Sequence, residues 1–157
     1  IINQIEKLQL KDQEDLWELV DLENIGVFGH SFGGGTSVVS LKYDDRVDAA
    51  VALDGWIKPV PNEIVKEGVK KPLMYIGQES WEDTLNYHKL EVLIHNSGVN
   101  ANKILLSNTK HFDYSDTPYF NSIVKTIGFS GDMSTDVMID TLNYYLTSFF
   151  DKNLKGQ

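Results

Sequence analysis

The sequence predicts an α/β fold in which about four parallel strands are flanked by helices. Short β-prone runs alternate with longer segments of helical periodicity, which is typical of βαβ units. The run from Val47 to Leu53 is almost entirely apolar, as expected for a parallel strand that is covered on both faces. Polar residues follow directly after predicted strands, at the edge where sites form in parallel sheets.

The composition fits one globular domain with a core of its own. The 157 residues are 41% hydrophobic, and no stretch is apolar enough to span a membrane. A net charge of −9 argues against a nucleic-acid partner and against a basic patch for anionic membranes. The absence of cysteine excludes thiol catalysis, thiolate metal sites and disulfides.

The chain opens with a predicted amphipathic helix, Ile1 to Val20. Its apolar positions are Ile1, Ile5 and Leu8, followed by a second patch of Leu16, Leu19 and Val20. A turn then leads into the first predicted strand, Ile25 to Phe28. Because the chain opens inside this helical pattern, residue 1 does not look like a natural start, and the lack of a signal peptide is uninformative.

The first strand runs into Gly-His-Ser-Phe-Gly at residues 29–33, ahead of a predicted helix from Phe32 to Leu41. A serine at the apex of so tight a turn is held in a strained backbone conformation that presents its Oγ to solvent. Side chains at Gly29 or Gly33 are expected to collide with the adjacent strand and helix. The N–H of Phe32 opens the helix and points to where an oxyanion would form. The motif therefore favours Ser31 as a nucleophile over a glycine-rich turn with a capping serine.

The remaining elements follow from the same periodicities. Strands are predicted at Val47–Leu53, Leu73–Ile76 and Lys103–Ser107, and helices at Asn62–Gly68, at Asp83–Asn96 and from Ser134 or Thr135 onward. A loose segment is expected between Thr117 and Gly131. In the last helix, a stripe of Met138, Leu142, Tyr145 and Phe149 predicts core packing.

A serine nucleophile requires a base within hydrogen-bonding reach. The turn should direct His30 away from the serine, so that it serves as a local packing or hydrogen-bonding group. His88 and His95 fall within a predicted helix and are expected to face solvent. His111 alone follows a strand and lies in a polar loop, which makes it the candidate base.

The acid has two candidate positions. Asp54 ends an apolar strand abruptly, where a buried carboxylate needs a partner to offset its desolvation. Glu79, Glu82 and Asp83 lie one strand later, and they resemble a solvated helix start with favourable dipole charges. These arguments give Asp54 a modest lead.

Four stretches add a family likeness. They are Gly-His-Ser-Phe-Gly-Gly at 29–34, Ala-Leu-Asp-Gly-Trp at 52–56, Pro-Leu at 72–73 and Gly-Asp-Met-Ser-Thr-Asp-Val-Met-Ile-Asp at 131–140. Between roughly Glu23 and Leu154 the chain resembles the plasma-type platelet-activating factor acetylhydrolases, and Ala-Leu-Asp-x-Trp is the most specific element. The family usually continues with a Gln-Asn-Phe type sequence after its histidine, whereas this chain has Phe-Asp-Tyr at 112–114.

The resemblance implies an α/β-hydrolase fold and a carboxylic ester hydrolase, in which Ser31 is the nucleophile, Asp54 the acid and His111 the base. It implies short or oxidised acyl esters of phospholipid-like or simple alcohols as substrates, and no metal or cofactor. Two alternatives stay open. One is an inactive half-domain that folds only by association, and the other is a cutinase-like polyester esterase with the later acid.

The same resemblance implies that residues 1–157 form a single partial domain, the carboxy-terminal half, without the amino-terminal strands. The loop that supplies the family's second oxyanion donor would belong to the other half. The strand Ile25 to Phe28 would then lie at an edge of the sheet. We expect either the amino-terminal half or a second copy of the chain to cover this edge.

Overall fold

The computed structural model describes residues 1–11, 19–79, 81, 84–120 and 123–156. Its centre is a four-stranded sheet with the order β1-β2-β3-β4. The strands are β1 (Ile25–His30), β2 (Val47–Leu53), β3 (Leu73–Gln78) and β4 (Ala101–Leu106), and all neighbouring pairs are parallel. His30 lies opposite Leu53, and Leu53 lies opposite Ile76, so the carboxyl ends of the first three strands are nearly level.

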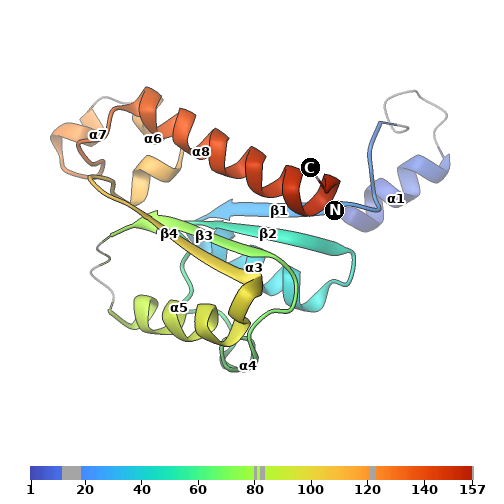
Figure 1. Cartoon of the computed structure of the whole chain (residues 1–157). Coiled ribbons are helices and arrows are strands. Elements are labelled where there is room, and N and C mark those ends of the chain that lie inside the picture. Colours follow the sequence, from blue (N-terminus) through green and yellow to red (C-terminus); the bar gives the residue numbers. More distant parts are fainter. Residues whose placement is uncertain (12–18, 80, 82–83, 121–122, 157) are drawn as a thin grey trace.

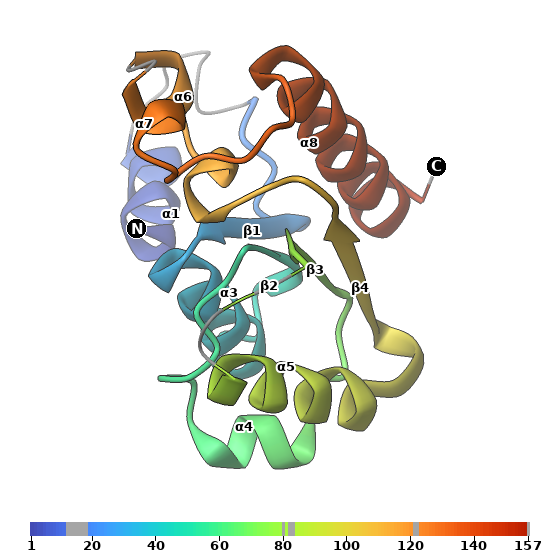
Figure 2. The same ribbon diagram turned by 90° about the vertical axis from the view of Figure 1, so that its left-hand side faces the viewer.

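Helices cover both faces of this sheet (Figure 1). On one face lie α3 (Phe32–Tyr43), α4 (Asn62–Glu67) and α5 (Thr84–Ser97). On the other lies α8 (Thr135–Phe150), which continues into a π-helical turn over Asp151–Lys155. Figure 2 looks onto the strand ends and shows the short helices α6 (Thr117–Phe120) and α7 (Ile123–Thr126) on the same side as α8.

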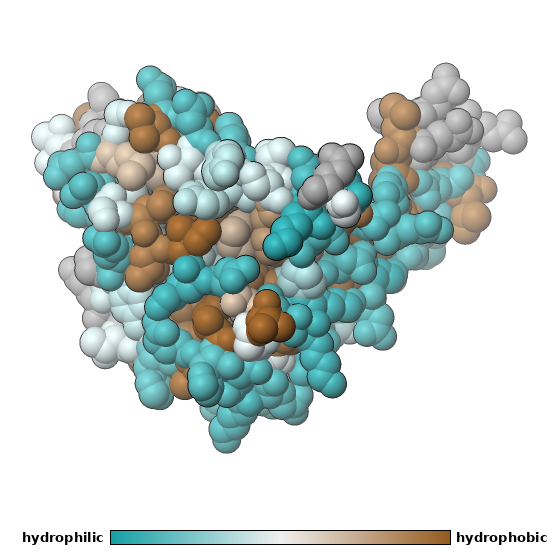
Figure 3. Space-filling model, viewed as in Figure 1, coloured by the Kyte–Doolittle hydropathy of each residue, from teal (hydrophilic) through white to brown (hydrophobic). Residues whose placement is uncertain are grey.

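The two faces of the central strands supply two apolar clusters. Ala50 and Ala52 of β2 point into the cluster beneath α3, α4 and α5, and Val51 and Leu53 point into the cluster beneath α8. The alternation explains why β2 is almost continuously apolar, as predicted. On the surface in Figure 3, hydrophilic residues predominate and hydrophobic ones gather beneath α8, over β4.

The predicted helix Ile1 to Val20 is confirmed at its start, and its last two residues are not helical. The observed helix α1 spans Ile2–Lys11, residues 12–18 with Leu16 lie outside the described part of the chain, and Leu19 lies in a turn with 82% of its surface exposed. The carbonyl oxygen of Val20 accepts a hydrogen bond from Gln9 Nε2 instead of from a following helical turn. The Asp21 carboxylate accepts from the N–H of Glu23, and such local bonds compete with helix formation.

Other boundaries differ by one or two residues, and one segment needs correction. β1 and β3 each extend two residues beyond the predicted end, and β4 begins two residues earlier than predicted. The segment from Thr117 to Gly131, expected to be loose, contains the helices α6 and α7. The Ser115 hydroxyl accepts a hydrogen bond from the Thr117 N–H, which helps to begin the first of these turns.

Candidate active site

Ser31 lies at a sharp turn between β1 and α3. Its backbone has φ 58° and ψ −118°, outside the regions that non-glycine residues prefer, as the motif predicted. The turn is held from both sides, because the Ser31 N–H donates to the carbonyl of Leu53 and the Ser31 carbonyl accepts from the N–H of Trp56. Phe32 is the first residue of α3, where N–H groups have no partner within the helix.

The expectation that both glycines of this turn avoid collisions is confirmed at Gly29 and wrong at Gly33. A Cβ at Gly29 would lie 2.6 Å from the carbonyl carbon of Gly33, so this position does require glycine. The expectation for Gly33 is wrong, because a Cβ there would meet no atom within 4 Å. Gly34 is the residue that lets α3 approach the sheet, since its Cβ would lie 2.7 Å from the Cα of Gly55.

Asp54 follows β2 directly and is fully buried. Oδ1 accepts hydrogen bonds from Trp81 Nε1 at 2.8 Å and from the Gln78 N–H at 3.0 Å, and Oδ2 accepts from Gln78 Nε2 at 2.8 Å. These donors replace the water that a buried carboxylate loses. The site also depends on Gly77, because a Cβ there would lie 2.7 Å from Oδ1.

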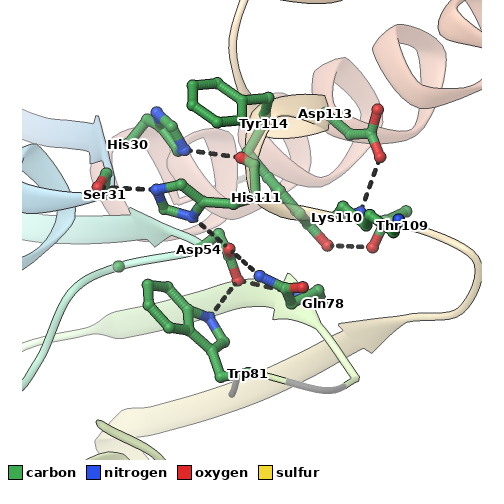
Figure 4. Close-up of polar contacts among 12 residues, drawn as sticks. His30, Ser31, Asp54, Gln78, Trp81, Thr109, Lys110, His111, Asp113 and Tyr114 are labelled. Atoms are coloured by element: carbon green, nitrogen blue, oxygen red, sulfur yellow. Dashed lines mark hydrogen bonds and ion pairs between the residues drawn. The ribbon is translucent and has the colours of Figure 1, made fainter. Parts of the chain in front are cut away.

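His111 connects the other two side chains (Figure 4). Its Nδ1 lies 2.7 Å from Asp54 Oδ2, and its Nε2 lies 2.9 Å from Ser31 Oγ. With the hydrogen on Nδ1 directed to the carboxylate, Nε2 is free to accept from the serine hydroxyl. The structure therefore brings all three predicted side chains into one hydrogen-bonded row at the carboxyl ends of β1, β2 and β4.

The loop that carries His111 is held by hydrogen bonds to the segment before α8. Asp113, in the 3₁₀ turn His111–Tyr114, is buried and accepts from the N–H groups of Lys110 and Gly131, both at 2.7 Å, and from the Ser130 hydroxyl. The sequence Phe-Asp-Tyr at 112–114, which differs from the family pattern, thus supplies a carboxylate, Asp113, that holds the loop in place. Nearby, burial raises the pKa of the Tyr114 hydroxyl, which keeps it protonated.

The competing residues lie elsewhere. His88 and His95 are exposed on α5, as predicted. Glu79 accepts a hydrogen bond from the Ser107 hydroxyl at 2.7 Å, and it is exposed. Glu82 and Asp83 lie outside the described residues.

Sequence reasoning missed two of the side chains that surround Asp54. Gln78 is the last residue of β3, and Trp81 lies three residues further on, where its indole ring also packs edge-on against His111 at a centroid distance of 5.0 Å. Both lie beside the alternative candidates for the acid, Glu79, Glu82 and Asp83. Little in the sequence singles them out as partners of a carboxylate, because neither residue type is charged.

The described residues show neither a metal site nor a membrane-spanning helix. No group of three or more His, Asp or Glu residues there could hold a metal ion. Within the same residues, no helix is long and apolar enough to cross a membrane.

A serine, an imidazole and a buried carboxylate in one row, at the carboxyl ends of parallel strands, is the arrangement typical of serine hydrolases. Among solved structures, the chain is similar to a ferulic acid esterase from Streptomyces cinnamoneus, with a TM-score of 0.74 and 25% identity over 99% of this chain and 48% of that one. It also matches a single-residue variant of Arabidopsis thaliana SOBER1 in fold, with a TM-score of 0.53 and 16% identity over 98% of this chain and 64% of that one. The fold is thus that of the α/β-hydrolases.

Residues 4–157 match the family model described as platelet-activating factor acetylhydrolase, isoform II, and the chain belongs to this family. The platelet-activating factor acetylhydrolase of Gallus gallus is 30% identical over 145 residues, which cover 91% of this chain and 34% of that protein. The enzyme of Canis lupus familiaris is 29% identical over 147 residues, which cover 91% and 32%. The chain therefore spans about a third of the length of the curated relatives that it matches.

Proposed function

We propose that this chain carries the reacting side chains of a carboxylic ester hydrolase that cleaves short acyl esters, including those of phospholipid-like alcohols. The observation that supports the proposal best is the row from Asp54 Oδ2 through His111 to Ser31 Oγ, with contacts of 2.7 and 2.9 Å. The names of the relatives support the acetyl ester, because they are platelet-activating factor acetylhydrolases.

In the proposed reaction, Ser31 Oγ attacks the ester carbon while His111 Nε2 takes the hydroxyl proton. Asp54 stabilises the resulting imidazolium through Nδ1. The Phe32 N–H donates to the oxyanion of the tetrahedral intermediate. The alcohol leaves with the proton from Nε2, and a water molecule then attacks the acyl group by the same route.

A cavity beside the nucleophile supports an ester with an apolar part. Its volume is about 230 Å³, and it is lined by Phe32, Gly35, Thr36, Val39, Pro59 and Val60. Phe32 thus borders both the reacting atoms and the cavity. An acetyl or other short acyl group is much smaller than this space, so the cavity would hold the apolar part of the ester.

Aromatic acid esters are a second candidate class of substrate. Phe32 and Trp56 are 61% and 38% exposed and pack edge to face at a centroid distance of 6.3 Å. A planar acyl group can stack on such a pair. The solved structure of a ferulic acid esterase supports this reading. Comparing kcat/KM for methyl ferulate with that for p-nitrophenyl acetate distinguishes the two classes.

The proposal is tested by labelling with a fluorophosphonate. Ser31 is expected to be the only modified residue, and Ser31→Ala should abolish the labelling while Ser37→Ala and Ser40→Ala leave it intact. Mass spectrometry of the digested protein identifies the site. A folded protein that is not labelled would instead support the inactive half-domain, and labelling that survives in Ser31→Ala would refute the nucleophile.

A further inference from the structure

His30 contacts the main chain of the residue that would act as the base. Its Nε2 lies 2.8 Å from the main-chain oxygen of His111, and the two rings are 4.5 Å apart with a tilt of 41° (Figure 4). Because a carbonyl oxygen only accepts, Nε2 of His30 must carry the hydrogen. The contact joins the end of β1 to a loop 81 residues further along the chain.

This contact acts on a different part of His111 from the others. Asp54 and Ser31 bind the two ring nitrogens, whereas His30 binds the backbone. His111 lies at the start of a four-residue 3₁₀ turn, and the bonds of Asp113 join that turn to the segment before α8 rather than to β1. The His30 bond fixes the backbone of this turn relative to the strand that leads to Ser31.

We propose that His30 is a positioning residue that holds His111 in place while its bond to Ser31 is absent. The proposal rests on the proposed function. When the Ser31 Oγ–acyl bond has formed and the alcohol has left with the proton, Oγ has no hydrogen to donate to Nε2. Nε2 must then bind a water molecule, take its proton as the water oxygen attacks the acyl carbon, and return that proton to Oγ as the Oγ–acyl bond breaks.

Two hydrogen bonds within the protein hold His111 through that second half of the reaction. In one, His111 Nδ1 donates to Asp54, and in the other, the main-chain oxygen of His111 accepts from His30, the residue adjacent to Ser31. The His30 bond fixes the distance between the backbones of the nucleophile and the base in both halves. Deacylation should therefore depend on His30 more than acylation does, because in acylation the third bond comes from Ser31, which is part of the fold, whereas in deacylation it comes from a water molecule that is not attached to the protein.

The charge of His30 suits this role. Burial lowers the pKa of His30 and the neighbouring His111 lowers it further, while the hydrogen bond to the His111 carbonyl and then Asp54 oppose them more weakly. A neutral His30 keeps its hydrogen on Nε2. It also adds no positive charge next to the imidazolium that forms on His111 during each proton transfer.

Burst kinetics with p-nitrophenyl acetate separate the two halves of the reaction. His30→Phe keeps a ring but loses the donor, and we expect it to slow deacylation by about tenfold, the effect of one lost hydrogen bond, with a smaller change in the burst rate. His30→Gln keeps an N–H at a similar reach and should restore most of the deacylation rate. His88→Phe, on the exposed face of α5, is the matched control and should change neither rate.

Equal losses in both rates, or a His30→Gln variant as slow as His30→Phe, would overturn the inference. If the wild-type protein neither turns over nor labels, the proposed function fails, and the imidazole nitrogen NMR signals of His111 decide the inference alone. We expect one tautomer with hydrogen on Nδ1 in the wild type and a broadened, mixed signal in His30→Phe. An unchanged signal would overturn the positioning role.

Discussion

Asp54 is the residue whose charge the proposed reaction needs most. Asp54→Asn should keep the fold, because an amide oxygen in the place of Oδ1 can still accept from Trp81 Nε1 and from the Gln78 N–H. The amide group then faces His111 Nδ1 and can hold His111 in the wrong tautomer. We expect kcat to fall by about 10⁴, the scale found when such an acid is made neutral. Steady-state hydrolysis of p-nitrophenyl acetate measures this loss.

Glu79→Gln is the matched control for that experiment, because Glu79 is exposed and binds the Ser107 hydroxyl. It should change kcat little. If Asp83→Asn, rather than Asp54→Asn, proves to be the crippling substitution, the acid lies at the later position and the cutinase-like reading gains support.

The lowered pKa of His30 also predicts a pH dependence of stability. Below the ordinary histidine pKa of 6.5, the unfolded chain binds a proton at His30 while the folded chain does so only at lower pH. The unfolded state then holds more protons, so the free energy of unfolding falls as the pH drops from about 6.5 towards the folded pKa. His30→Gln should lose this part of the slope.

Urea denaturation at a series of pH values from 5 to 8 measures the effect. His88→Gln, an exposed histidine on α5, should keep the wild-type slope. Wild-type and His30→Gln curves that run parallel would show that the folded state does not disfavour the charged form of His30.

At this scale, the sequence predicted which side chains could meet but not how they are held. Ser31 follows from a local motif, and its strained φ of 58° is a property of that one turn. The choice between Asp54 and Glu79 stayed open on the residues alone, since it depends on which carboxylate the fold buries. Gln78, Trp81 and His30 were missed or left general because their partners lie 24–81 residues away.

At the scale of the elements, α8 covers one face of the sheet through two fully packed positions. Phe149 and Met138 are 8% and 3% exposed, whereas Tyr144 points outward and is 67% exposed. Phe149→Ala should destabilise the protein by about 3 kcal/mol through lost burial and the cavity it leaves. Thermal or urea unfolding measures the change, and Tyr144→Ala should cost far less.

A Phe149→Ala variant as stable as Tyr144→Ala would mean that α8 does not depend on this face.

The stripe that contains Phe149 was predictable, because its period of 3.6 residues requires no knowledge of the partner strand. The end of the predicted helix Ile1 to Val20 was not predictable in the same way. Its apolar pattern includes Leu19 and Val20, but neither residue is helical, and the Val20 carbonyl accepts a hydrogen bond from Gln9 Nε2.

At the scale of the whole molecule, the sheet order leaves β1 at an edge. Within the described residues β1 pairs only with β2, so one row of its backbone groups faces outward. α8 and the turn after it cover part of the strand, since Phe150 and Leu154 surround Gly26, but Phe28 remains 59% exposed. An open edge with exposed apolar side chains invites pairing with another chain.

We therefore expect further polypeptide to cover the Ile25–Phe28 edge in the assembled protein. The curated relatives are about three times as long as this chain, so the segment that corresponds to their remaining part is the occupant we expect. The isolated 157-residue chain should then self-associate as its concentration rises, because the same edge can pair with a second copy. Light scattering measures this, and co-expression with the remaining segment should abolish it.

Phe28→Lys places a charge on that edge and should weaken the self-association, because natural sheets protect their edges in this way. Tyr144→Lys, on the exposed face of α8, is the matched control and should leave it unchanged.

If the wild-type chain is instead a folded monomer at high concentration, the edge needs no partner. Hydrogen exchange then distinguishes two explanations: amides of β1 that exchange as slowly as those of β2 would show that α8 and α1 protect the edge, and faster exchange in β1 would show that the exposed edge is tolerated.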